Sequence, residues 1–211
     1  MHKIIVLMVA LFASACSGDI SPSHLPYFTA GDLTPVFDTV NGQDISSYKK
    51  VGSFSLVGQN GELVTDMTVS NRPYVATFFF TECTGICPTL RTRLSVVQDR
   101  FDGNDLTMLS VSIASEDQDL SKLQAYSSIN GIHPEVWKLV TGNATEIQDL
   151  ALDSFGVRLD LNGNMYAHTE TVYLVDAQGY IRGLYNGTLE VDMLQLLKDL
   201  DILVSENSDV S

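Results

Sequence analysis

The chain is 211 residues long, carries 12 Lys and Arg against 26 Asp and Glu, and has a formal net charge of −14 at pH 7. With 45% hydrophobic and 18% charged residues, its composition is that of a folded protein and excludes a disordered chain or a solvated coiled coil. Such an acidic surface repels phosphate, which excludes sequence-independent nucleic-acid binding, and it repels an anionic membrane, so that any membrane attachment requires an anchor.

Residues 1–15 have the features of a secretory signal peptide. A positively charged start precedes an apolar run at 4–13 that is short for a bilayer span. Small residues directly precede Cys16, and this arrangement resembles the lipobox of bacterial lipoproteins. The resemblance implies that Cys16 is lipidated, that residues 1–15 are removed, and that the protein faces the periplasm as a membrane-anchored lipoprotein of a bacterial cell envelope. Ordinary cleavage after Ala15, with release of the protein, is the alternative.

The remainder of the chain is predicted to consist of a tether and one domain. Residues 16–35 contain the lipidated cysteine and are rich in Ser, Gly and Pro, which is typical of a flexible tether. From residue 36 the apolar pattern becomes regular and contains no internal repeat. We therefore predict a single folded domain over 36–205.

The apolar pattern of this domain predicts an α/β fold. The expected elements are a hairpin at 54–64 around Asn60-Gly61, a buried strand at 74–80, a helix after Pro88, a buried strand at 106–113, a helix at 120–129, a short strand at 136–140, a helix from 143 to 156, a hairpin at 171–185, and a helix at 188–203 with Val191, Leu194, Leu197 and Leu200 along one stripe. This order implies a mixed sheet with helices on both faces. Such a sheet places its reactive site at the carboxyl end of a central strand.

That position is occupied by Thr-Glu-Cys-Thr-Gly-Ile-Cys-Pro, residues 81–88. With Cys16 assigned to lipid, Cys83 and Cys87 are the remaining thiols. At positions i and i+4 around a helix start, their Cα atoms are expected about 6 Å apart, which fits either a disulfide or two sulfurs on one metal ion. A purely structural disulfide is the alternative, but closing so short a loop stabilises a fold only slightly. The position therefore favours a functional pair.

Two thiolates are too few for a closed metal site, so a third ligand is expected. His168 directly precedes the strand predicted at residue 171, and such a strand entry can lie beside the cysteine loop in an open sheet. His133 lies in a loop before a proline and is the weaker candidate. The acidic run at 116–119 is interpreted as a helix start favoured by the helix dipole.

Four motifs occur in order along the domain. They are F-x-F-T-x-C-x3-C-P at 78–88, Ser-Val-Ser-Ile at 110–113 followed by acidic residues, Leu-Val-Thr-Gly at 139–142, and His168 before Tyr-Leu-Val-Asp at 173–176. With these motifs, residues 54–199 resemble the Sco/SenC proteins, thioredoxin-fold copper-assembly factors for cytochrome c oxidase. The chain departs from the usual family pattern at Thr84-Gly85 within the cysteine loop and at Ala114-Ser115 after the second buried strand.

The resemblance implies a thioredoxin-like mixed sheet flanked by helices, with an N-terminal β-hairpin and a hairpin inserted in the C-terminal half. It implies that Cys83, Cys87 and His168 bind one copper ion. The implied function is that of a copper chaperone, which delivers copper to the binuclear copper site of cytochrome c oxidase subunit II or reduces the cysteines of that site. A periplasmic copper or thiol protein is the other implied partner.

A thiol-disulfide enzyme is the alternative from another functional class. It would be a periplasmic oxidoreductase that uses Cys83 and Cys87 in catalysis, with metal binding incidental. Thioredoxin-type reductases carry a cis-proline opposite their cysteines, and no proline follows Pro134 in this chain. The sequence therefore favours the metallochaperone and leaves enzyme activity open.

Overall fold

The computed structural model describes residues 24–37, 44–159 and 170–208. Its elements in chain order are β1 (Tyr27–Phe28), β2 (Pro35–Val36), β3 (Ser55–Gly58), β4 (Leu63–Thr65), α1 (Asp66–Val69), β5 (Tyr74–Phe79), α2 (Cys87–Arg100), β6 (Thr107–Ser112), the 3-10 helix η1 (Ser115–Gln118), α3 (Leu120–Ile129), β7 (Trp137–Thr141), α4 (Ala144–Asp149), the π-helix η2 (Leu150–Ser154), β8 (Thr171–Val175), β9 (Ile181–Asn186) and α5 (Glu190–Ser208). The predicted strands and helices are confirmed close to their expected ends, except that α5 continues to Ser208.

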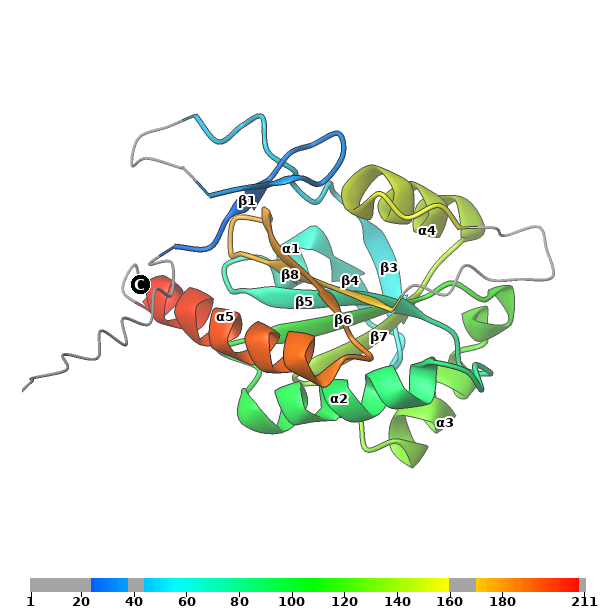
Figure 1. Ribbon diagram of the computed structural model, residues 1–211. Helices are drawn as coiled ribbons and strands as arrows, with labels where there is room; N and C mark the ends of the chain where they lie inside the picture. Colours follow the sequence, from blue (N-terminus) through cyan, green and yellow to red (C-terminus); the bar gives the residue numbers. More distant parts are fainter. Residues whose placement is uncertain (1–23, 38–43, 160–169, 209–211) are drawn as a thin grey trace, which may run out of the picture.

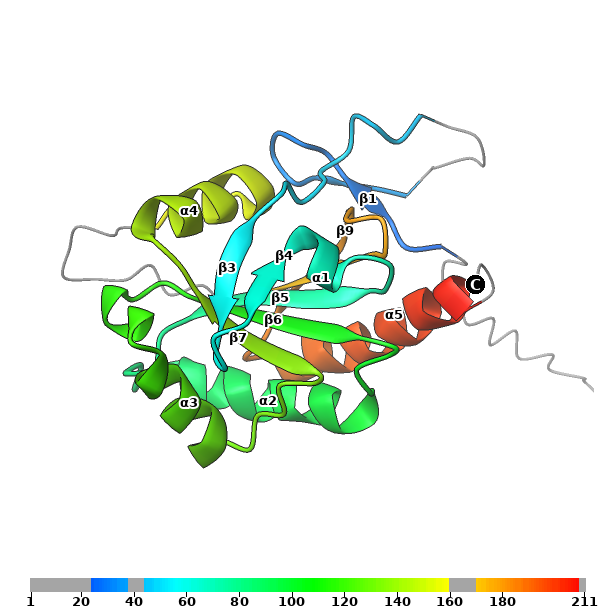
Figure 2. The same ribbon diagram turned by 180° about the vertical axis from the view of Figure 1, so that it is seen from behind.

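The main sheet has seven strands in the order β4-β3-β7-β6-β5-β8-β9. The central strands β5, β6 and β7 run parallel, and the outer pairs are antiparallel, so the sheet is mixed as predicted. The two predicted hairpins form its edges as β3-β4 and β8-β9. Helices α2, α3 and α5 cover one face and α4 covers the other (Figures 1 and 2). A separate small sheet is formed by β1 and β2.

Strand β5 lies at the centre of the core, and every one of its side chains is buried. Because successive side chains of a strand point to opposite faces, Val75 and Phe79 pack in the cluster that contains the apolar residues of α2 and α5. Ala76 and Phe78 pack on the other side, in the cluster that contains the apolar residues of α4. This double burial explains the uninterrupted run of β-forming residues in the sequence.

Helix α5 buries a stripe that only partly matches the one expected. Its buried apolar residues are Met193, Leu196, Leu200 and Leu203, whereas Val191 is 69% exposed and Leu194 is 54% exposed. Of the four residues expected to face the core, Leu200 is buried and Leu197 packs partly buried against it, so the expectation was correct there and wrong at Val191 and Leu194. Apolar residues occur around much of this helix, and a buried hydrogen bond from the Tyr185 hydroxyl on β9 to the Asp199 carboxylate (2.7 Å) helps to select the face that packs on the sheet.

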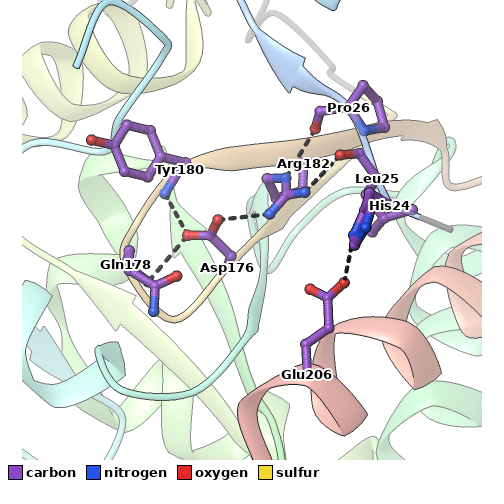
Figure 3. A network of polar contacts seen from close by, with 8 residues as sticks. All are labelled: His24, Leu25, Pro26, Asp176, Gln178, Tyr180, Arg182 and Glu206. Carbon is purple, nitrogen blue, oxygen red and sulfur yellow. Dashed lines mark hydrogen bonds and ion pairs between the residues drawn. The ribbon is translucent and has the colours of Figure 1, made fainter. Parts of the chain in front are cut away.

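A buried ion pair joins the β8-β9 hairpin to the N-terminal segment (Figure 3). The Arg182 guanidinium donates to the Asp176 carboxylate at 3.0 Å and to the carbonyls of Leu25 (2.6 Å) and Pro26 (3.0 Å). It also lies over the Tyr27 ring, 4.1 Å from the ring centre. Burial raises the pKa of the Asp176 carboxyl, and the Arg182 guanidinium opposes that rise. The guanidinium thus fixes both the turn and the N-terminal segment.

The predicted tether, residues 16–35, is described from His24 onward. There the chain packs on the domain, because the side chains of Leu25 and Phe28 are buried and β1 pairs with β2. The apolar residues within this Ser-, Gly- and Pro-rich stretch account for the packing. Cys16 lies outside the described residues, and the boundary between tether and domain at residue 36 stays a prediction.

Replacing Arg182 with methionine should lower the free energy of unfolding by about 3 kcal/mol, because the substitution leaves the Asp176 carboxylate buried without its cation. Urea unfolding followed by circular dichroism measures this change. Arg100→Met is the matched control, since Arg100 pairs with Asp201 where both side chains are about half exposed and such pairs contribute about 1 kcal/mol or less. Equal losses in the two variants would contradict a stabilising role for the buried pair.

Candidate redox and metal site

The two cysteines lie in the loop that leaves the carboxyl end of β5. After the strand ends, the backbone N–H of Cys83 donates to the carbonyl of Phe80 at 3.3 Å, and Cys87 begins α2. Cys83 and Cys87 form a disulfide with their Cα atoms 5.9 Å apart. Both residues are more than nine-tenths buried. The thiols of the domain are therefore already adjacent, without any rearrangement of the backbone.

The first turn of α2 fixes the position of Cys87. Pro88 follows it in the first turn, where the missing N–H of proline costs no helical hydrogen bond. Leu90, Leu94 and Val97 then anchor the helix in the core beneath it. Because the amino end of a helix carries partial positive charge, this position stabilises a thiolate once the disulfide is reduced, and thiolate is both the nucleophile and the metal-binding form.

The inner side of the disulfide is closely packed. Cys87 borders a cavity of about 20 Å³ together with Leu90, Tyr126 and Trp137. Beneath it, the Trp137 indole N–H donates to the Ser110 hydroxyl at 2.8 Å. A cavity of that size holds about one water molecule, so a reaction partner has to reach the sulfurs from the outer side.

A buried carboxylate beside the loop was not anticipated as part of the site. Asp119 caps α3 by accepting the Ser121 N–H at 3.0 Å, which confirms a helix start in the acidic run. Asp117 instead points inward, is 1% exposed, and accepts hydrogen bonds from Thr81 and Ser112 at the ends of β5 and β6. The sequence feature that could have indicated Asp117 is its position shortly after a buried strand, at the edge of the sheet where the reactive site was expected.

The segment that precedes β8 begins at the same edge of the sheet. Strand β8 is antiparallel to β5, with Tyr173 opposite Ala76, so β8 starts at the carboxyl end of β5. The carbonyl of Glu170 accepts the N–H of Gly187 at 2.7 Å, and Leu90 of α2 packs against Gly187 so closely that a Cβ there would overlap it. The entry to β8 therefore lies beside the first turns of α2.

Of the two candidate histidines, only His133 lies within the described residues. His168 lies outside the described residues. His133 is exposed in the turn before β7. Because β7 is parallel to β6 and β5, that turn lies at the amino edge of these strands, away from the cysteines. Within the described ranges, no group of three or more His, Cys, Asp or Glu side chains is placed to hold a metal ion. The described part of the site supplies two sulfurs, which become available as ligands after reduction.

A mixed sheet between helices, with a Cys-x3-Cys disulfide at the carboxyl end of its central strand, defines a thioredoxin-like domain. The SCO1/SenC family model matches residues 42–202, and the chain belongs to this family. The resemblance noted in the sequence is thereby confirmed.

Similar proteins of this family come from bacteria and plants. A SCO1 protein homolog of Bacillus subtilis is 25% identical over 179 residues, which are 82% of this chain and 93% of the relative. The structure resembles a SCO1/SenC family lipoprotein of Bacillus anthracis, with a TM-score of 0.67 and 22% identity over 74% of this chain and 95% of the other. It also resembles copper-bound ScoI of Arabidopsis thaliana, with a TM-score of 0.55 and 21% identity over 71% of this chain and 97% of the other. These similarities support the thioredoxin-like fold.

Reduction of the Cys83–Cys87 disulfide should lower the free energy of unfolding by no more than about 2 kcal/mol, because it opens a loop of about five residues. Urea unfolding with and without a thiol reductant measures the change, with Cys16→Ser in every sample. A variant that also carries Cys83→Ser is the control and should not respond to the reductant. Unfolding of the protein on reduction alone would indicate a structural disulfide and contradict a functional pair.

Proposed function

We propose that this chain is a copper-carrying assembly factor for cytochrome c oxidase. Cys83, Cys87 and His168 hold one copper ion, which the protein delivers to the binuclear copper site of oxidase subunit II, or else the dithiol reduces the cysteines of that site. The observation that carries the proposal is the disulfide-bonded cysteine pair at the carboxyl end of β5 in a SCO1/SenC domain. A similar structure, BsSco, is a member of the Sco family of cytochrome c oxidase assembly proteins, and it contains a disulfide switch.

The chemistry of the donor set fits copper as a transferable cargo. Soft thiolates favour Cu(I), and imidazole also binds copper well. Two sulfurs and one nitrogen leave the coordination open, which suits a metal that is passed on, whereas zinc favours a fourth donor. Since a disulfide does not coordinate the ion, oxidation of Cys83 and Cys87 couples metal loading to redox state.

The geometry around β8 supports His168 as the third ligand. His168 is two residues before Glu170, and Glu170 lies at the edge of the sheet where α2 begins with Cys87. Because only two residues separate His168 from this edge of the sheet, we expect its imidazole within reach of the cysteine loop. His133, at the opposite edge of the parallel strands, is too far along the sheet to serve.

A thiol-disulfide oxidoreductase is the second candidate, and the closed disulfide favours it. In this function the reduced Cys83 and Cys87 pair would transfer two electrons to a protein disulfide, with no requirement for a metal or for His168. The two candidates therefore differ in whether a histidine outside the cysteine loop is needed.

The His168→Ala variant should bind Cu(I) at least tenfold more weakly than the parent, because it loses one of three ligands. A titration of the reduced full chain, with Cys16→Ser in every sample, against a competing Cu(I) chelator measures the affinity. His133→Ala is the matched control and should bind as the parent does. Disulfide exchange with glutathione should be unchanged in both variants. Copper binding that is weak in the parent, or indifferent to His168, would contradict the copper proposal and favour the oxidoreductase.

We also propose that the protein is anchored in the bacterial cell envelope through a lipid on Cys16 and faces the periplasm. No helix within the described residues is long and apolar enough to span a bilayer. The similar Bacillus anthracis protein is a SCO1/SenC family lipoprotein, which supports an anchor of this kind. Several acyl chains together hold a protein at a membrane, whereas a single chain binds only marginally.

Cys16→Ser should move the protein from the membrane fraction to the soluble fraction, because it removes the site of acylation. Fractionation of bacteria that express the full chain, together with incorporation of a labelled fatty acid, measures both effects. Cys83→Ser is the control, since it removes another thiol and should leave the protein labelled and bound to membranes. Labelling that persists in Cys16→Ser would exclude this cysteine as the acylated residue.

A further inference from the structure

The buried carboxylate of Asp117 binds the chain that leads into the cysteine loop. It accepts the backbone N–H of Thr81 on Oδ2 at 3.0 Å and the hydroxyl of Thr81 on Oδ1 at 2.5 Å. The hydroxyl of Ser112 donates to Oδ2 at 2.5 Å. Hydrogen bonds to a charged acceptor are about twice as strong as neutral ones. A buried carboxylate with three such donors is therefore a firm attachment point for Thr81.

These bonds begin where the backbone ladder between β5 and β6 ends. The last register pair is Phe79 opposite Ser112, and beyond it the N–H of Ile113 donates to the carbonyl of Phe79 at 2.9 Å. Asp117 then connects Ser112 to Thr81 through its side chain, past the end of the ladder. Because Thr81 is two residues before Cys83, the connection holds the first cysteine close to the central strands.

We propose that Asp117 is a positioning residue that favours the closed disulfide over the open dithiol. A disulfide requires Cα atoms about 4.4–6.8 Å apart, and the observed separation is 5.9 Å. Helix α2 fixes Cys87 in the core, and Asp117 fixes the segment that carries Cys83. Once the S–S bond is broken, the covalent link between Cys83 and α2 is lost, the segment that carries Cys83 is held less tightly, and the bonds to Thr81 weaken. If the bonds of Asp117 are stronger in the disulfide than in the dithiol, the redox equilibrium shifts toward the disulfide by that difference in free energy.

The proposal deepens the proposed function, because it names what sets the redox state of the same site. It rests on that function only in taking the disulfide to be reversibly reduced. In the exchange reaction two glutathione thiols supply two electrons and two protons. The S–S bond between Cys83 and Cys87 breaks, two cysteine thiols form, and one glutathione disulfide is produced.

Asp117→Ala should shift the exchange equilibrium with glutathione at least tenfold toward the dithiol, a change of about 30 mV in reduction potential. The full chain with Cys16→Ser in every sample is equilibrated in glutathione buffers, and the reduced fraction is measured by thiol alkylation and mass spectrometry. Two milder variants should shift the exchange equilibrium in the same direction by less. They are Asp117→Asn, which keeps the size of the side chain, and Thr81→Val, which removes one hydroxyl. Asp119→Ala removes a similar negative charge from the exposed cap of α3, and it should leave the equilibrium unchanged.

Urea unfolding of each variant in both redox states separates positioning from general stabilisation. If Asp117 only stabilises the fold, its replacement lowers the stability of both states equally and leaves the exchange equilibrium unchanged, and this result would overturn the proposal. If the alanine variant does not fold, Asp117→Asn and Thr81→Val are used instead, and an unchanged exchange equilibrium in both would overturn the proposal. The assay contains no copper, so its outcome is independent of whether His168 binds the metal.

Discussion

The parallel pairing of β5 with β6 is the constraint on which the rest of the structure depends. Both strands are buried on both faces, so their backbone groups have to pair with neighbouring strands, and buried polar side chains such as Thr77 and Ser110 have to hydrogen-bond to each other. Where the ladder stops, beyond Phe79 and Ser112, both chains leave the sheet at the same edge. The disulfide and the Asp117 carboxylate therefore lie together at this edge.

Two buried carboxylates fix opposite ends of the central sheet by different means. Asp176 follows β8 at the end where Val175 pairs with Tyr74, the first residue of β5, and it is balanced by the cation of Arg182. Asp117 lies at the other end, where neutral N–H and O–H groups donate to it. The N-terminal segment is consequently attached at the end of the sheet away from the disulfide.

This separation has a consequence for the proposed attachment to a membrane. An anchor on Cys16 would join the domain through the segment that Arg182 holds at Leu25 and Pro26. The cysteine loop, at the opposite end of β5, would then be presented away from the anchored end. An acidic domain repelled by anionic lipid surfaces is compatible with such an arrangement, because only the N-terminal segment has to approach the membrane.

The sequence by itself determined the strands and helices, the two hairpins and the cysteine loop at a strand end, because these depend on local periodicity, turn residues such as Asn60-Gly61, and the spacing of Cys83 and Cys87. Only the tertiary structure decided which stripe of α5 is buried, that Leu25 packs on the domain, and that Asp117 turns inward. Each of these depends on a partner outside the segment concerned: Tyr185 for α5, Arg182 for Leu25 and Thr81 for Asp117. Local patterns specify an element, but its orientation is set by the groups against which it packs.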